Sequence, residues 1–218
     1  FDEFVLAAST DTLTDEPAAR EHADAVEFRL DLADDPLEQL SAYDGELPII
    51  ATNRAAWEAG GASDETERLL TVETALEYDA VAAIDLECRA LDGSVAAADT
   101  ETAQQVRTSA REAGVPVIAS IHDFEATPPR EKLTALLDRA ADAGTVGKLA
   151  TTAHDRGDAL ALLSATTSDS GRQDAPIYGS AIGYAPVEAA EATAPGQYPL
   201  ATLRELVDGL ATPTNNDV

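Results

Sequence analysis

Lysine is almost absent from this chain: Lys132 and Lys148 stand against twelve arginines and 41 aspartates and glutamates. The formal net charge of −27 excludes a protein that binds nucleic acid or an anionic membrane through a basic face. Cys88 is the only cysteine, so no disulfide can form within the chain and a reducing compartment is the simplest expectation. No stretch approaches the ~18 consecutive apolar residues of a membrane span, and no leader-like segment precedes Phe1. We expect a soluble, cytoplasmic protein.

The excess of carboxylates is the largest departure from ordinary composition. At 44% apolar residues the chain can still bury a sizeable core. A charge of this size repels itself in dilute salt, whereas in molar salt the Debye length falls to ~3 Å and screens the repulsion. We interpret the acid excess and the scarcity of lysine as an adaptation to a salty cytoplasm, and not as part of the function.

Short apolar runs alternate with polar or amphipathic segments along the whole chain. The runs predict seven buried strands, at residues 4–9, 25–31, 48–54, 81–87, 115–122, 144–152 and 177–182. The intervening periodicity predicts helices at residues 10–22, from 36 onward, and at 63–79, 100–113, 127–143, 155–165 and 199–210. This alternation indicates parallel βαβ units. No glycine-rich dinucleotide or P-loop motif is present, so we predict one α/β domain over residues 1–218, a (β/α)8 TIM barrel.

The predicted strand count falls one short of such a barrel. Between Lys148 and residue 177 there is one helix and a polar loop at 168–174, with no room for a further strand and helix. The seventh strand of the barrel and its loop are therefore not visible in the sequence. The chain also lacks methionine, even at position 1. Either a segment is missing from this sequence or the barrel is interrupted there.

Two chemically capable side chains lie at the ends of consecutive predicted strands. Lys148 lies in a strand of small apolar residues, on the same face as Val146 and Ala150. Burial can lower the pKa of an ammonium by roughly 3–5 units, which would make the amine nucleophilic near neutral pH and suited to Schiff-base formation with a carbonyl compound. His122 is the natural general base beside it. The alternative is a lysine that reaches solvent and a histidine that caps a loop.

Other polar residues also fall where predicted strands end. Glu27 and Arg29 either belong to a site at that end of the sheet or form a structural ion pair. A metal site on Asp85, His122 and Asp123 is not favoured, because one histidine with scattered acids is a poor ligand set. Cys88 has no histidine near it in sequence, so we expect a packed thiol and not a nucleophile.

At these positions the chain resembles type I 3-dehydroquinate dehydratases. The resemblance runs nearly end to end and rests on these motifs: Glu27-Phe28-Arg29-Leu30-Asp31, Thr52-Asn53-Arg54 with Glu58, Gly60 and Gly61, Ile84-Asp85-Leu86-Glu87, His122-Asp123-Phe124 with Thr127-Pro128, Lys148 before Thr151-Thr152-Ala153, Gly179-Ser180, and Ala194-Pro195-Gly196-Gln197.

The resemblance implies a (β/α)8 barrel that dimerises, needs no metal or cofactor, and acts in the shikimate pathway to chorismate and the aromatic amino acids. It would convert 3-dehydroquinate to 3-dehydroshikimate by loss of water. Lys148 would form the imine and His122 would transfer the protons. The supporting and substrate-binding positions that it implies are as follows: Glu58 and Asp85 tune or orient His122; Glu27, Arg29 and Arg54 hold ring hydroxyls; Thr193 and Gln197 lie near the carboxylate; Ser9 lines the end of the first strand.

One departure from the family coincides with the strand deficit. The family's seventh strand leads to a Ser-Arg pair whose arginine binds the substrate carboxylate, and no such segment occurs here. Two alternatives therefore stay open. A class I aldolase would use the same lysine, but its late phosphate-binding glycine loop is not evident. An inactive barrel kept for binding would explain the missing strand.

Overall fold

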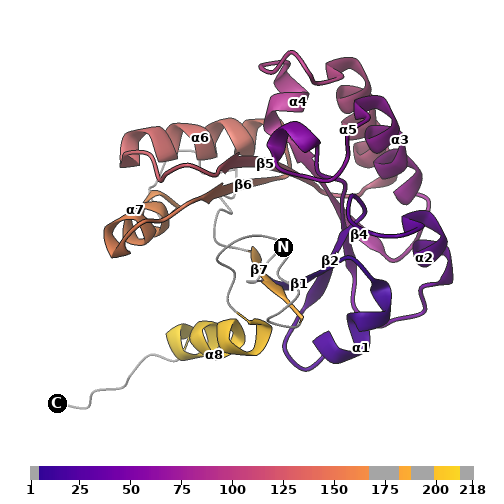
Figure 1. Ribbon diagram of the computed structural model, residues 1–218, viewed down its shortest axis with the longest axis horizontal. Coiled ribbons are helices and arrows are strands. Elements are labelled where there is room, and N and C mark those ends of the chain that lie inside the picture. The colour runs from indigo at the N-terminus through magenta and orange to yellow at the C-terminus, as the bar shows by residue number, and fades with distance from the viewer. Residues whose placement is uncertain (1–4, 167–181, 188–198, 212–218) are drawn as a thin grey trace.

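The computed structural model describes residues 5–166, 182–187 and 199–211 of the protein. Its centre is a curled parallel sheet of seven strands in the order β6-β5-β4-β3-β2-β1-β7 (Figure 1). The strands are β1 (Val5–Thr10), β2 (Ala25–Arg29), β3 (Ile49–Thr52), β4 (Val81–Glu87), β5 (Val117–Asp123), β6 (Val146–Thr151) and β7 (Ile182–Pro186).

Most of the helices lie on the convex side of this sheet, α2, α3 and α5 most plainly (Figure 1). The helical elements of the described residues are η1 (Leu13–Asp15), α1 (Glu16–Ala19), α2 (Pro36–Ala42), η2 (Ala56–Glu58), α3 (Glu65–Ala75), α4 (Cys88–Asp92), α5 (Thr100–Ala113), α6 (Arg130–Ala143), α7 (Arg156–Thr166) and α8 (Leu200–Ala211). Local chemistry sets several of their ends. Asp64 and Asp99 cap α3 and α5 by accepting hydrogen bonds from the backbone N–H groups three residues on. Gly114 ends α5 in the left-handed region, at φ 74°.

The predicted alternation of strands and helices is confirmed, with local differences. The segment at 10–22 is one 3-10 turn and one α-helical turn, because Pro17 lacks an N–H and must lie in the first turn of a helix. The second strand ends at Arg29, where the chain turns, two residues before the predicted end. Helix α4 follows β4 directly and was not predicted. β7 begins at Ile182, and residues 177–181 of the predicted last strand lie outside the described part of the chain.

The sheet is parallel throughout, as predicted, but it is not described as a closed barrel. Within residues 5–166, 182–187 and 199–211, β6 and β7 are the two edges of the sheet, and no described strand joins them. An α/β fold with a curled parallel sheet is therefore established. Closure by an eighth strand stays a prediction.

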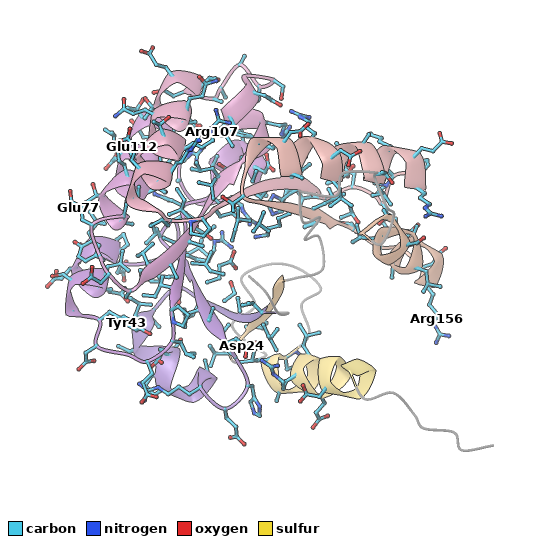
Figure 2. All side chains as sticks on the ribbon, turned by 180° about the vertical axis from the view of Figure 1, so that it is seen from behind. Asp24, Tyr43, Glu77, Arg107, Glu112 and Arg156 are labelled. Carbon is cyan, nitrogen blue, oxygen red and sulfur yellow. The ribbon has the colours of Figure 1, made fainter. Side chains whose placement is uncertain are left out.

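The C-terminal helix packs against the start of the chain. Leu200 of α8 joins Leu6, Ala8 and Ala19 in one buried cluster. Arg204 binds Asp24 through a 2.6 Å ion pair, and Figure 2 shows Asp24 beside α8. Oδ2 of Asp24 also accepts a 2.8 Å hydrogen bond from the backbone N–H of Leu6, so the contact ties α8 to the start of β1, the strand that pairs with β7.

Among the described residues, no helix is both long and apolar enough to cross a bilayer.

Acidic side chains populate the outer surface. Glu77 and Glu112 are both exposed and point away from the sheet in Figure 2. We expect the melting temperature to rise by about 10 °C or more between ~0.1 M and ~3 M KCl, because screening removes repulsion worth several kcal/mol. Thermal melts followed by circular dichroism would measure this. Sucrose at matched osmolality strengthens burial without screening charge, so it should give a much smaller rise. A flat response to KCl would remove the salt-adaptation interpretation.

Candidate active site

The concave face of the sheet has an apolar floor and a polar layer above it. Side chains alternate along a strand, so residues two apart share a face. The floor is formed by Ala7, Ala25, Ile50, Ala83, Ile118 and Val146, one from each of β1 to β6. Two residues further along each strand stand Ser9, Glu27, Thr52, Asp85, Ser120 and Lys148. The polar layer therefore lies towards the C-terminal ends of the strands, where barrel-type α/β proteins carry their chemistry.

Lys148 lies within this layer and not in bulk solvent. Its Nζ is 2.9 Å from Oδ2 of Asp85 and 3.3 Å from Oε1 of Glu27, and its side chain is 13% exposed. Ser120 donates a 2.5 Å hydrogen bond to the other oxygen of Asp85. The structure thus contradicts the alternative in which this lysine reaches out into water.

Glu27 connects three strands of the polar layer. Ser9 donates to its Oε2 at 2.6 Å and Thr52 donates to its Oε1 at 3.3 Å. Burial raises the pKa of Glu27, but the charges of Lys148 and Arg54 outweigh burial and lower the pKa below its usual value. This carboxylate is therefore ionised at neutral pH.

Asp85 has the same balance of effects in a stronger form. Burial raises its pKa, while the charges of Lys148 and Arg54 act in the opposite direction and bring the pKa down to about 2. His122 and the hydrogen bond from Ser120 add to this lowering. The amine of Lys148 thus lies between two carboxylates that stay charged throughout the neutral range.

Arg29 forms a planar, two-bond ion pair with Asp31. Its Nε and Nη2 lie 2.8 and 2.6 Å from the two carboxylate oxygens, and both side chains are buried. Asp31 also accepts from the backbone N–H of Gly61 at 2.9 Å. A Cβ at Gly60 would lie 2.1 Å from the carbonyl oxygen of Arg54, and one at Gly61 would lie 2.3 Å from that of Asp31. Both glycines are therefore needed for the close packing of this loop.

His122 is held by Glu58. Its Nδ1 lies 3.0 Å from Oε1 of Glu58, and its backbone N–H donates to the same oxygen at 3.1 Å. Both side chains are almost fully buried. Burial raises the pKa of Glu58, but its bonds to His122 and Arg89 outweigh this and lower it, so the carboxylate is an acceptor only. Nδ1 must then carry the hydrogen, which leaves Nε2 as the basic nitrogen. The ring of Phe124 stacks on the imidazole at 5.7 Å.

The charge of His122 is controlled by the same surroundings. Burial is the largest effect and lowers its pKa below 6.5, and the positive charges of Arg54 and Lys148 lower it further. Glu58 and Asp85 oppose this without outweighing it. The imidazole is therefore neutral at neutral pH, as a general base requires.

A second buried cluster supports the loop that carries Arg54 and Glu58. Glu87 accepts from the backbone N–H of Ala55 at 2.9 Å through Oε1. Its Oε2 lies 2.9 Å from Nη1 of Arg68, although no well-directed hydrogen bond reaches that oxygen, and burial raises the pKa of Glu87. Arg68 also donates to the carbonyl of Asn53 at 3.0 Å. Arg68 also pairs with Glu65 of the same helix at 2.7 Å, but its contacts with Glu87 and Asn53 join other elements and could not be predicted from local sequence.

The structure brings most of the predicted site residues to one end of the sheet. Thr193 and Gln197 lie outside the described residues. Cys88 is fully buried, and burial raises the pKa of its thiol to about 11, so the prediction of a packed thiol is confirmed. Within the described ranges, no three His, Cys, Asp or Glu side chains are grouped as metal ligands. The residues placed at the predicted end of the sheet are Ser9, Glu27, Arg29, Arg54, Glu58, Asp85, His122 and Lys148.

Comparison with known proteins shows which family this chain belongs to. A sequence model described as type I 3-dehydroquinase matches residues 5–177. The chain belongs to the type I 3-dehydroquinase family. Among curated dehydroquinases, the 3-dehydroquinate dehydratase of Haloarcula marismortui is 51% identical, with 96% of this chain and 97% of that protein covered. That of Halobacterium salinarum is 44% identical, with coverages of 96% and 99%. The resemblance seen in the sequence motifs is therefore confirmed, and the haloarchaeal relatives agree with the salt-adaptation interpretation.

A solved dehydroquinase structure shares the fold. The 3-dehydroquinate dehydratase of Geobacillus kaustophilus HTA426 superimposes with a TM-score of 0.78 at 25% identity, over 98% of this chain and 93% of that one. The alignment with the Haloarcula dehydroquinase runs over 227 positions, more than the 218 residues of this chain. That relative therefore has residues that have no counterpart in this chain.

Proposed function

We propose that this protein dehydrates 3-dehydroquinate to 3-dehydroshikimate through an imine on Lys148. Its curated relatives are named 3-dehydroquinate dehydratase. The observation that supports this most is the position of Lys148. Its amine lies within a buried polar layer, 2.9 Å from Asp85, and a neutral imidazole held by Glu58 is on the neighbouring strand. A lysine in such a place is suited to covalent catalysis on a ketone.

The proposed reaction begins when the neutral amine of Lys148 attacks the ring ketone to form a carbinolamine. The imidazole of His122 then delivers a proton taken up from solvent to the carbinolamine oxygen, which leaves as water, so that an iminium ion forms on Lys148. Nε2 of His122 removes a proton from the neighbouring carbon, and the electron pair moves into the iminium to give an enamine. The enamine expels the hydroxyl group, which takes the proton from His122 and departs as water. Hydrolysis of the new iminium releases the product ketone and restores the amine.

The two carboxylates beside Lys148 suit this sequence electrostatically. The positive charge lies on the nitrogen of Lys148 in the iminium and moves to the imidazole when the proton is abstracted. Glu27 and Asp85 are held ionised in the resting protein. They would therefore stabilise each cationic state without reorganising during the reaction.

The remaining assignments follow the same geometry. We propose that Arg29 and Arg54 hold ring hydroxyls, together with Glu27, and that Ser9 lines this end of the site. Thr193 and Gln197 stay predicted contacts near the carboxylate. Assembly as a homodimer and a place in the cytoplasm also stay predictions. The aldolase alternative would use the same Lys148 and gains no observation of its own, and the inactive-barrel alternative rests only on the missing strand.

The direct test is turnover. The protein in molar KCl, supplied with 3-dehydroquinate, should generate the ultraviolet absorbance of a conjugated enone, and a chelator should leave the rate unchanged. A ketose phosphate cleaved in the same buffer would favour the aldolase alternative instead. Folded protein that gives no enone from 3-dehydroquinate would contradict the proposal.

A further inference from the structure

Arg89 is a charged side chain that the sequence motifs did not single out. It lies at the start of α4, directly after β4, and its side chain is 37% exposed. Its Nε and Nη2 donate hydrogen bonds of 3.0 and 2.9 Å to Oε2 of Glu58, whose own side chain is completely buried. Arg89 therefore brings a positive charge from the edge of the protein onto a buried carboxylate.

An aromatic ring fixes the orientation of this guanidinium. The Arg89 guanidinium lies 5.1 Å from the centroid of the Trp57 ring, and that of Arg68 lies 5.9 Å from the same centroid. Trp57 is held in turn by its Nε1, which donates to Glu65 at 3.0 Å. Because Trp57 and Glu58 are adjacent in η2, the stack and the ion pair constrain the same short segment.

The two oxygens of Glu58 have separate partners. Oε1 accepts from Nδ1 and from the backbone N–H of His122, and Oε2 accepts from Arg89. We propose that Arg89 is a positioning residue that holds Glu58 against His122 and, through Glu58, sets the basicity of the imidazole. This inference rests on the proposed role of His122 as general base.

The sign of the effect follows from the charges around the imidazole. Lys148 on β6, Arg54 after β3, Asp85 on β4 and Glu58 in η2 all act on His122. Without Arg89, no guanidinium offsets the negative charge of Glu58. Glu58 then stabilises the imidazolium form of His122 more strongly. The apparent pKa of His122 should then rise, and activity should be lost at a higher pH as the solution is acidified.

The experiment is the pH profile of kcat/KM, which reports the groups of the free enzyme, for wild type, Arg89→Gln and Arg89→Lys in molar KCl. We expect Arg89→Gln to shift the acidic limb upward by about 0.5 to 1 pH unit and to lower the plateau by about 3- to 10-fold. Arg89→Lys keeps the charge but cannot form two parallel bonds. The acidic limb of Arg89→Lys should therefore lie close to the wild-type pH, whereas its plateau rate should stay below that of the wild type.

A matched control exists on α6. Arg139 is similarly exposed, at 36%, and also donates through Nε and Nη2 to one oxygen of a carboxylate, that of Asp92. Arg139→Gln should leave the limb and the plateau unchanged. A loss of plateau without any movement of the limb in Arg89→Gln would indicate a merely structural role and overturn the proposal.

Failure of this inference can be told from failure of the proposed function. If borohydride with substrate modifies Lys148 in wild type, the function stands. An Arg89→Gln profile that superimposes on that of Arg139→Gln then overturns only the role of Arg89. Should Arg89→Gln not fold, Arg89→Ala is measured in its place, and an acidic limb that stays at the wild-type pH in that variant overturns the proposal.

Discussion

Lys148→Ala is expected to lose turnover by at least about 10⁴-fold, because alanine has no amine with which to form the imine. The ultraviolet assay with 3-dehydroquinate measures this directly. Lys132→Ala is the matched control, since Lys132 is the other lysine of the chain and is exposed on α6. It should keep the wild-type rate. A Lys148→Ala protein with more than a hundredth of that rate would contradict the imine mechanism.

The same variant should also change the dependence of stability on pH. In the wild type, Lys148 helps to lower the pKa of Asp85 from 3.8 to about 2, so this contribution is fully present above pH 3.8 and is lost as pH falls through about 2. Without the lysine, Asp85 and Glu27 are buried carboxylates that have lost a neighbouring cation, and burial should raise their pKa values. The destabilisation of Lys148→Ala, measured by thermal melts, should therefore be largest at neutral pH and smaller near pH 4.

His122→Ala is expected to lower kcat by about 10²- to 10⁴-fold, the usual contribution of a positioned general base. Imine formation should persist, because Lys148 and its two carboxylates are untouched. His154→Ala is the control, since that histidine is exposed. A wild-type rate in His122→Ala would end the assignment of the base.

The pH profile gives a second measure of His122. Its pKa lies below 6.5 in the folded protein, chiefly because of burial. Wild-type kcat/KM, which reports the groups of the free enzyme, should therefore stay level as pH falls through 6.5 and drop only at a lower pH, where the imidazole takes up a proton. In His122→Ala this acidic limb should disappear from the residual activity. An acidic limb that lies above pH 6.5 in the wild type would contradict the buried position of His122 beside Glu58.

Local sequence pattern was enough to place the candidate site residues on particular strands, because the strand period and the position of the candidate site coincide in this fold. The period of two that predicts a strand also decides which residues face inward, so Lys148 and Glu27 could be assigned to the ends of strands before any contact was known. The ends of α5 were predicted for a similar reason, since Gly114 marks its C-terminus within the sequence itself.

Contacts between residues that are distant in sequence could not be predicted in this way. Arg89 and Glu58 are 31 residues apart, and nothing local to either residue indicates that they meet. Arg68 lies on the buried side of α3 for the same non-local reason, because its partner Glu87 belongs to β4. The direct entry of β4 into α4 was also missed, since no turn signal separates the two elements.

The predicted shortage of one strand agrees with what the structure describes. Seven strands form the sheet of the described residues, and β6 is an edge of it. The alignment with the Haloarcula relative is longer than this chain, so the relative has residues that this chain lacks. The sequence motifs for Lys148 and His122 are unaffected by this difference, because β5 and β6 are both complete.

The central claim is that Lys148 forms a covalent imine with the substrate ketone. The most direct measurement is reduction by borohydride in the presence of 3-dehydroquinate, followed by intact mass and peptide mapping. We expect one adduct per chain, heavier by one substrate or product molecule less one oxygen atom, on Lys148 and absent when substrate is omitted. Folded, active protein with no adduct, or with the adduct on Lys132, would contradict it.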